Sequence, residues 1–128
     1  MKLLPDTHAL LWFIGNHPQL SAPARENIEN PAHEKFVSAA SLWEITVKLS
    51  WEKLKLPRPF GEVFPPQLEV NGFERQPFSC AQLNQRVALP FHHRDPFDRR
   101  LIAQALAEGM TVVTCDPEFL KYPAKILW

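Results

Sequence analysis

Residues 92–119 (HHRDPFDRRLIAQALAEGMTVVTCDPEF) constrain the possible fold more than any other stretch of the chain. Apolar side chains after Asp98 recur at helical spacing, and Gly109 follows as a typical residue just beyond a helix. Residues 111–114 have the β-branched composition of a short buried strand, which leads directly to Asp116. A helix that begins on a carboxylate and is followed by a strand that ends on one indicates part of a parallel α/β sheet.

The rest of the chain repeats this alternation of strands and helices. The patterns predict strands at 2–5, 36–37, 73–78, 111–114 and 125–127. They predict helices at 7–14, 21–30, 41–50, 60–70 (split or kinked at Pro65-Pro66), 79–87 and from about 96 to 108. Right-handed crossovers between parallel strands place helices on both faces of a sheet. We therefore expect one α/β domain over residues 1–128, a three-layer α/β/α sandwich around a mainly parallel sheet of four to five short strands.

Composition narrows the possible partners and the compartment. The 14 basic and 14 acidic residues balance, so nucleic-acid binding would need a local basic patch. Cys80 and Cys115 lack metal-site or disulfide spacing, and we expect both to be small core residues. The chain has no apolar run of membrane-spanning length and no secretory segment after Met1, which favours a cytoplasmic protein.

Four acids stand where a parallel sheet would gather them: Asp6, Glu44, Asp98 and Asp116. Asp6 and Asp116 follow predicted strands, and loops at strand C-termini meet at the ligand-binding edge of such a sheet. Each acid also has a purely structural interpretation as a helix cap, including a capping box from Ser41 to Glu44. Crowded carboxylates raise one another's pKa and need a cation nearby, so the group as a whole predicts a site for Mg²⁺ or Mn²⁺.

Three stretches, LLPDTHALLW, SAASLWEITVK and residues 92–119, occur in the order found in PIN domains. The chain resembles this family over nearly its whole length, and in particular the VapC-type ribonuclease toxins of bacterial toxin–antitoxin pairs. The four acids match the acids of the family pattern, whereas Pro5 replaces the usual aliphatic residue. The resemblance implies a Mg²⁺-dependent endoribonuclease acting on RNA such as tRNA. It further implies a homodimer and a cognate antitoxin.

Other residues beside the acids are candidates for supporting roles. Thr7, Asp95 and Thr114 could orient metal ligands, or could be ordinary strand and cap residues. The candidates for RNA contact are Arg94, Arg99, Arg100 and Lys48, each of which could equally be a solvated surface charge. Trp43 and Trp51 could stack on bases, although burial or a dimer contact is the commoner role for such residues.

Two rival functions are compatible with the same acids. One is another metal-dependent phosphoesterase, cutting DNA or a small phosphoester. The other is a PIN-like interaction module without catalysis, for which the four intact acids provide no support.

Overall fold

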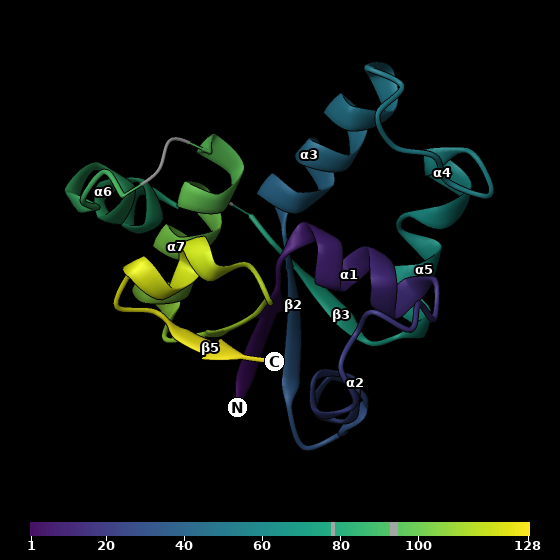
Figure 1. The fold of residues 1–128 in the computed structure, drawn as a ribbon, viewed down its shortest axis with the longest axis horizontal. Helices are drawn as coiled ribbons and strands as arrows, with labels where there is room; N and C mark the ends of the chain where they lie inside the picture. The colour runs from purple at the N-terminus through teal and green to yellow at the C-terminus, as the bar shows by residue number, and fades with distance from the viewer. Residues whose placement is uncertain (78, 93–94) are drawn as a thin grey trace.

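The computed structural model describes residues 1–77, 79–92 and 95–128 and contains one parallel five-stranded sheet. The strand order is β3-β2-β1-β4-β5, so β1 is the central strand and β3 and β5 lie at the two edges (Figure 1). The strands are β1 (Lys2–Pro5), β2 (Glu34–Ser38), β3 (Phe73–Gln76), β4 (Thr111–Val113) and β5 (Lys125–Leu127). The predicted α/β class and strand positions are confirmed, except that β3 ends at Gln76 and the predicted end at Phe78 lies outside the described residues.

The helices also follow the predicted order. They are α1 (Thr7–Ile14), α2 (Ala22–Glu29), α3 (Ala39–Ser50), α4 (Phe60–Val63), α5 (Pro66–Val70), α6 (Cys80–Ala88), α7 (Pro96–Glu108) and the 3-10 helix η1 (Pro117–Lys121). Residues 60–70 form two short helices because the consecutive prolines interrupt the pattern of backbone hydrogen bonds. Gly109 ends α7 with φ +65°, a left-handed conformation that glycine adopts at little cost.

The start of α3 differs from the prediction. The helix begins at Ala39 rather than at Ser41, because the Ser38 hydroxyl accepts a hydrogen bond from the Ala40 N–H and caps it. The proposed capping box from Ser41 to Glu44 is therefore wrong. Glu44 lies in the second turn of the helix and is available for another role.

Two apolar cores cover opposite faces of the sheet, as adjacent residues of each strand point to opposite sides. Leu3 and Val113 pack with α1, α2, α4 and α5, whereas Leu4 and Val112 pack with α7 and η1. The predicted three-layer arrangement is thus confirmed. The expectation that both cysteines are core residues is wrong: Cys80 opens α6 and Cys115 lies in the turn after β4, and both are exposed.

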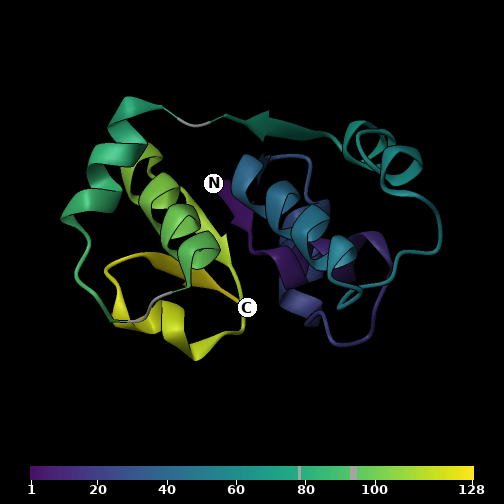
Figure 2. The same ribbon diagram turned by 90° about the horizontal axis from the view of Figure 1, so that it is seen from above.

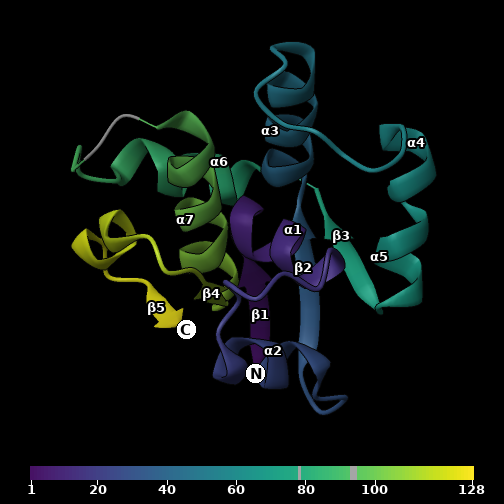
Figure 3. The same cartoon turned by 45° about the vertical axis from the view of Figure 1, so that its right-hand side comes forward.

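The topology brings three loops to one end of the sheet. The strands β1, β2 and β4 are parallel, so their C-terminal ends lead into α1, α3 and η1 at the same edge. Figure 3 shows α3 continuing past this end of β2, while α2 and the N-terminus lie at the opposite end. The helices α3 and α7 run side by side in Figure 2 and contact one another.

A buried polar network joins α7 to the sheet. The Ser38 hydroxyl donates to Gln104 Oε1, and Gln104 Nε2 donates to the Gln76 carbonyl at 3.2 Å. Gln104 is fully buried, so both of its amide atoms need these partners. One side chain thereby holds α7 against the ends of β2 and β3.

We predict that Gln104→Leu destabilises the protein by about 2 kcal/mol, because it leaves buried polar groups of β2 and β3 without partners. Urea unfolding followed by circular dichroism measures the change. Gln19→Ala, at an exposed position, should change the free energy of unfolding by less than about 0.5 kcal/mol. Equal stability of Gln104→Leu and the wild type would contradict the role of this network.

Candidate active site

Asp6 sits at the end of β1, where its backbone and side chain are both held. Its N–H donates to the Val113 carbonyl at 3.0 Å, which continues the ladder to β4. Asp6 Oδ1 accepts from the Ala9 N–H at 2.7 Å, and Oδ2 accepts from the Thr114 hydroxyl at 2.5 Å. The residue is only 6% exposed, and this burial raises the pKa of the carboxyl group. One oxygen caps α1 while the other faces the neighbouring strand.

Glu44 reaches the same edge from α3. Its Oε1 accepts from the Thr7 hydroxyl at 2.7 Å, and its Oε2 forms an ion pair with Lys48 Nζ at 2.5 Å. Glu44 is 5% exposed, so a free carboxylate there would be costly. Thr7 and Thr114 therefore each donate a hydrogen bond to one of the acids. A residue that orients a metal ligand needs such a contact.

Asp98 lies in the first turn of α7, whose N-cap is Asp95. The Asp95 Oδ1 atom accepts from the N–H groups of Phe97 and Asp98, at 2.9 and 3.0 Å. The pKa of Asp98 is raised to about 8, first by burial and then by the charges of Asp95, Glu44, Asp116 and Asp6. The charges of residues far apart in the sequence thus act on the Asp98 carboxyl group, so the four predicted acids influence one another electrostatically.

Asp116 is the fourth of these acids. We call the four residues together the acid cluster (Asp6, Glu44, Asp98 and Asp116). Its Oδ1 accepts from the Glu118 N–H at 3.0 Å and caps η1. Its own N–H donates to Thr114 Oγ1 at 3.1 Å, so Thr114 connects Asp116 to Asp6. Asp6 and Asp116 therefore each cap a helix and also belong to the acid cluster.

The acid cluster has the chemistry of a divalent-cation site. Carboxylate oxygens are the donors that Mg²⁺ and Mn²⁺ prefer. A nearby cation would offset the burial and the neighbouring charges that raise the pKa of Asp98. Within the described residues, no three acid, histidine or cysteine side chains already stand in a metal-coordinating arrangement. The donor set fits a divalent cation, and binding would require the side chains to draw together.

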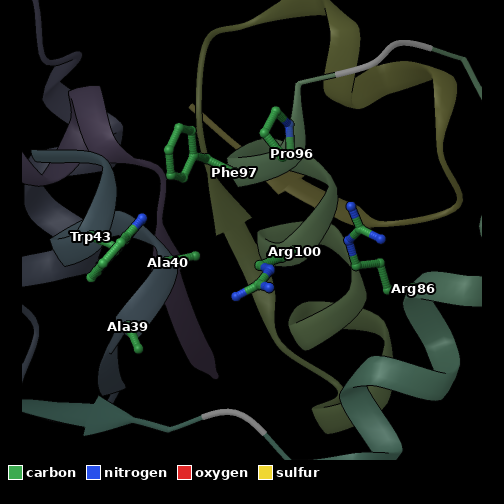
Figure 4. Close-up of a pocket in the computed structure, with 7 residues that line it drawn as sticks. All are labelled: Ala39, Ala40, Trp43, Arg86, Pro96, Phe97 and Arg100. Carbon is green, nitrogen blue, oxygen red and sulfur yellow. The ribbon is translucent and has the colours of Figure 1, made fainter. Parts of the chain in front are cut away.

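A groove of about 560 Å³ lies between α3 and α7, the helices that carry Glu44 and Asp98. Figure 4 shows its lining, which consists of Ala39, Ala40, Trp43, Arg86, Pro96, Phe97 and Arg100. Two of the lining residues, Trp43 and Phe97, directly precede Glu44 and Asp98 in the sequence. Arg86 was not identified from the sequence, because nothing local separates it from other arginines of a surface helix. Trp43 is 66% exposed and Trp51 is 63% exposed, so neither tryptophan is buried within the chain, and a dimer contact stays a prediction.

The structure corrects one candidate for RNA contact. Arg99 is 2% exposed and donates to the carbonyls of Pro90 and Leu89 and to the Tyr122 hydroxyl. Its guanidinium also lies 4.1 Å from the centre of the Phe91 ring. Arg99 therefore secures the loop before α7 and does not face a ligand. Arg94 lies outside the described residues.

A comparison with protein families decides the identity of the fold, because the sequence profile of the PIN domain matches residues 3–125. The chain belongs to the PIN-domain family. Members of this family are nucleases that generally use divalent metal ions.

Solved structures share this fold at low sequence identity. VapBC2 from Rickettsia felis, bound to a promoter DNA fragment, has a TM-score of 0.74 and 22% identity, with 100% of this chain and 99% of that chain covered. VapBC-1 from nontypeable Haemophilus influenzae has a TM-score of 0.67 and 12% identity, with 99% and 97% covered. FitAcB from Neisseria gonorrhoeae has a TM-score of 0.66 and 17% identity, with 98% and 96% covered. No curated protein sequence matches this PIN domain significantly.

The raised pKa of Asp98 sets a pH dependence of stability in metal-free protein. Above pH 4 the unfolded chain releases a proton that folded Asp98 keeps until about pH 8, so stability falls across this window. We predict that Asp98→Asn in EDTA has a melting temperature equal to the wild type near pH 4 and higher by about 3 °C at pH 8. Calorimetric melting measures both values.

Glu74→Gln, at an exposed position on β3, should follow the wild-type pH profile and serves as the control. A lower melting temperature of Asp98→Asn at pH 8 would show that ionised Asp98 stabilises the metal-free fold.

Proposed function

We propose that this protein is a Mg²⁺- or Mn²⁺-dependent endoribonuclease that hydrolyses RNA phosphodiester bonds at the acid cluster. The convergence of Asp6, Glu44, Asp98 and Asp116 on one sheet edge carries the proposal. A divalent ion bound there would lower the pKa of a water molecule and stabilise negative charge on the phosphate. The nuclease activity and metal use of the family support this assignment.

The chain's own residues prepare the site for that chemistry. Thr114 holds the Asp6 carboxylate and Thr7 holds Glu44, so two buried acids are oriented before any ligand arrives. Asp95 fixes the first turn of α7 and with it the position of Asp98. Burial of Asp6 and Glu44 excludes water, which strengthens the interaction of their charges with a cation.

The groove between α3 and α7 offers a path for a single-stranded substrate. Arg86 and Arg100 supply positive charge along it, and exposed Trp43 presents an aromatic surface for base stacking. Lys48 adds a further cation at the acid cluster. The balanced net charge of the chain is compatible with this local arrangement.

We also propose that the protein is the toxin of a toxin–antitoxin pair, acting in the cytoplasm as a homodimer that a cognate antitoxin inhibits. Support comes from similar structures, which include VapBC2 from Rickettsia felis and a toxin–antitoxin complex from Klebsiella pneumoniae. Within residues 1–77, 79–92 and 95–128, no helix has the length and apolarity to cross a bilayer.

A cleavage panel tests the activity. We expect purified protein with Mg²⁺ to cut RNA, including tRNA, and to leave DNA and a small phosphomonoester intact. Asp6→Asn and Asp98→Asn should lower the rate by at least about a hundredfold, because they remove charge that the metal needs. Glu74→Gln should retain the rate. Preferential cleavage of DNA or the phosphoester would assign the site to another phosphoesterase, and inactivity on all three would favour an interaction module.

Growth of bacteria tests the toxin assignment. We expect induced wild-type protein to arrest growth and Asp6→Asn and Asp98→Asn to be harmless at equal expression. Co-expression of the protein encoded by a short neighbouring reading frame should restore growth to cells that make the wild type. Equal toxicity of all three proteins would show that growth arrest does not depend on the acid cluster.

A further inference from the structure

Lys48 occupies an unusual position for a surface cation. It lies one turn after Glu44 on α3, and its Nζ atom contacts Glu44 Oε2 at 2.5 Å. The Glu44 side chain is 7% exposed, whereas that of Lys48 is 34% exposed. The ammonium group therefore reaches a buried carboxylate from the solvent side, and its flexible stem can leave without disturbing the core.

Both oxygens of Glu44 are engaged in this arrangement. Thr7 donates to Oε1 and Lys48 donates to Oε2, at 2.7 and 2.5 Å. Because the Lys48 ammonium contacts Glu44 Oε2, a divalent cation held in part by Glu44 would share that carboxylate with it. The two cations would repel one another strongly in a partly buried site. The hydroxyl of Thr7 is uncharged and compatible with the metal, so Lys48 is the group that competes with it.

We propose that Lys48 is a displaceable counter-ion of the acid cluster, which neutralises Glu44 while the site is empty and leaves it when a divalent cation binds. This inference rests on the proposed metal-dependent function. Lys48 then has two opposed effects: it stabilises the metal-free protein, and it weakens the binding of the metal. A lysine that merely oriented Glu44 as a ligand would strengthen metal binding instead.

Titration calorimetry of the full-length chain with Mn²⁺ at low ionic strength distinguishes these roles. We expect Lys48→Met to bind Mn²⁺ about tenfold more tightly than the wild type, because a competing positive charge is gone. The melting temperature of Lys48→Met in EDTA should fall by about 3 °C or more, since buried Glu44 loses its partner. Saturating Mn²⁺ should remove this difference. Lys48→Arg, which keeps the charge, should remain close to the wild type in both measurements.

Lys53→Met is the matched control, because it removes the same charge from an exposed lysine whose Nζ lies over the Trp51 ring. Its Mn²⁺ affinity should equal that of the wild type. Unchanged or weaker binding of Mn²⁺ by Lys48→Met, with the wild type binding normally, would overturn the counter-ion role alone. Failure of the wild type to bind Mn²⁺ would reject the metal site and this inference together.

Discussion

The repulsion between carboxylates buried at one edge of the sheet is the constraint on which the rest of the site depends. Burial and four neighbouring acids raise the pKa of Asp98 to about 8, and burial raises that of Asp6 as well. Such crowding opposes folding, so its presence needs a compensating interaction. Thr7, Thr114 and Lys48 each contact one of the acids and supply part of that compensation. A divalent cation would supply the remainder.

An acid that caps a helix can also belong to the acid cluster. A carboxylate has two oxygens, and Asp6 uses one for the first turn of α1 and the other for Thr114. Asp116 likewise caps η1 while its charge acts on Asp98. The caps restrict the rotamers of the acids, which places their charges before a ligand binds. A residue that the local sequence marks as a helix cap can therefore also belong to the acid cluster.

Neighbouring arginines in α7 have different roles because a helix turns about 100° per residue. Arg100 lines the groove beside α3, whereas Arg99 points to the other side and is buried against the loop before α7 and Tyr122. Arg99 thus helps to hold the segment that leads into Asp95 and Asp98. The groove and the acid cluster thus both depend on the position of α7, which carries Arg100 and Asp98.

The alternation of strands and helices, the end of α7 at Gly109 and the positions of the four acids were predictable from the sequence. They follow from local periodicity and from the conformational preferences of single residues. The burial of Arg99 and the exposure of Trp43 and the two cysteines were not predictable, since burial depends on packing between distant segments. Ser38 rather than Ser41 caps α3 for the same reason: its hydroxyl also donates to Gln104 of α7. The sequence alone determined that Asp6 and Asp116 follow strands of a parallel sheet, because local composition marks those strands. Only the tertiary structure decided which charges meet, because electrostatic energy depends on distance in space and not along the chain.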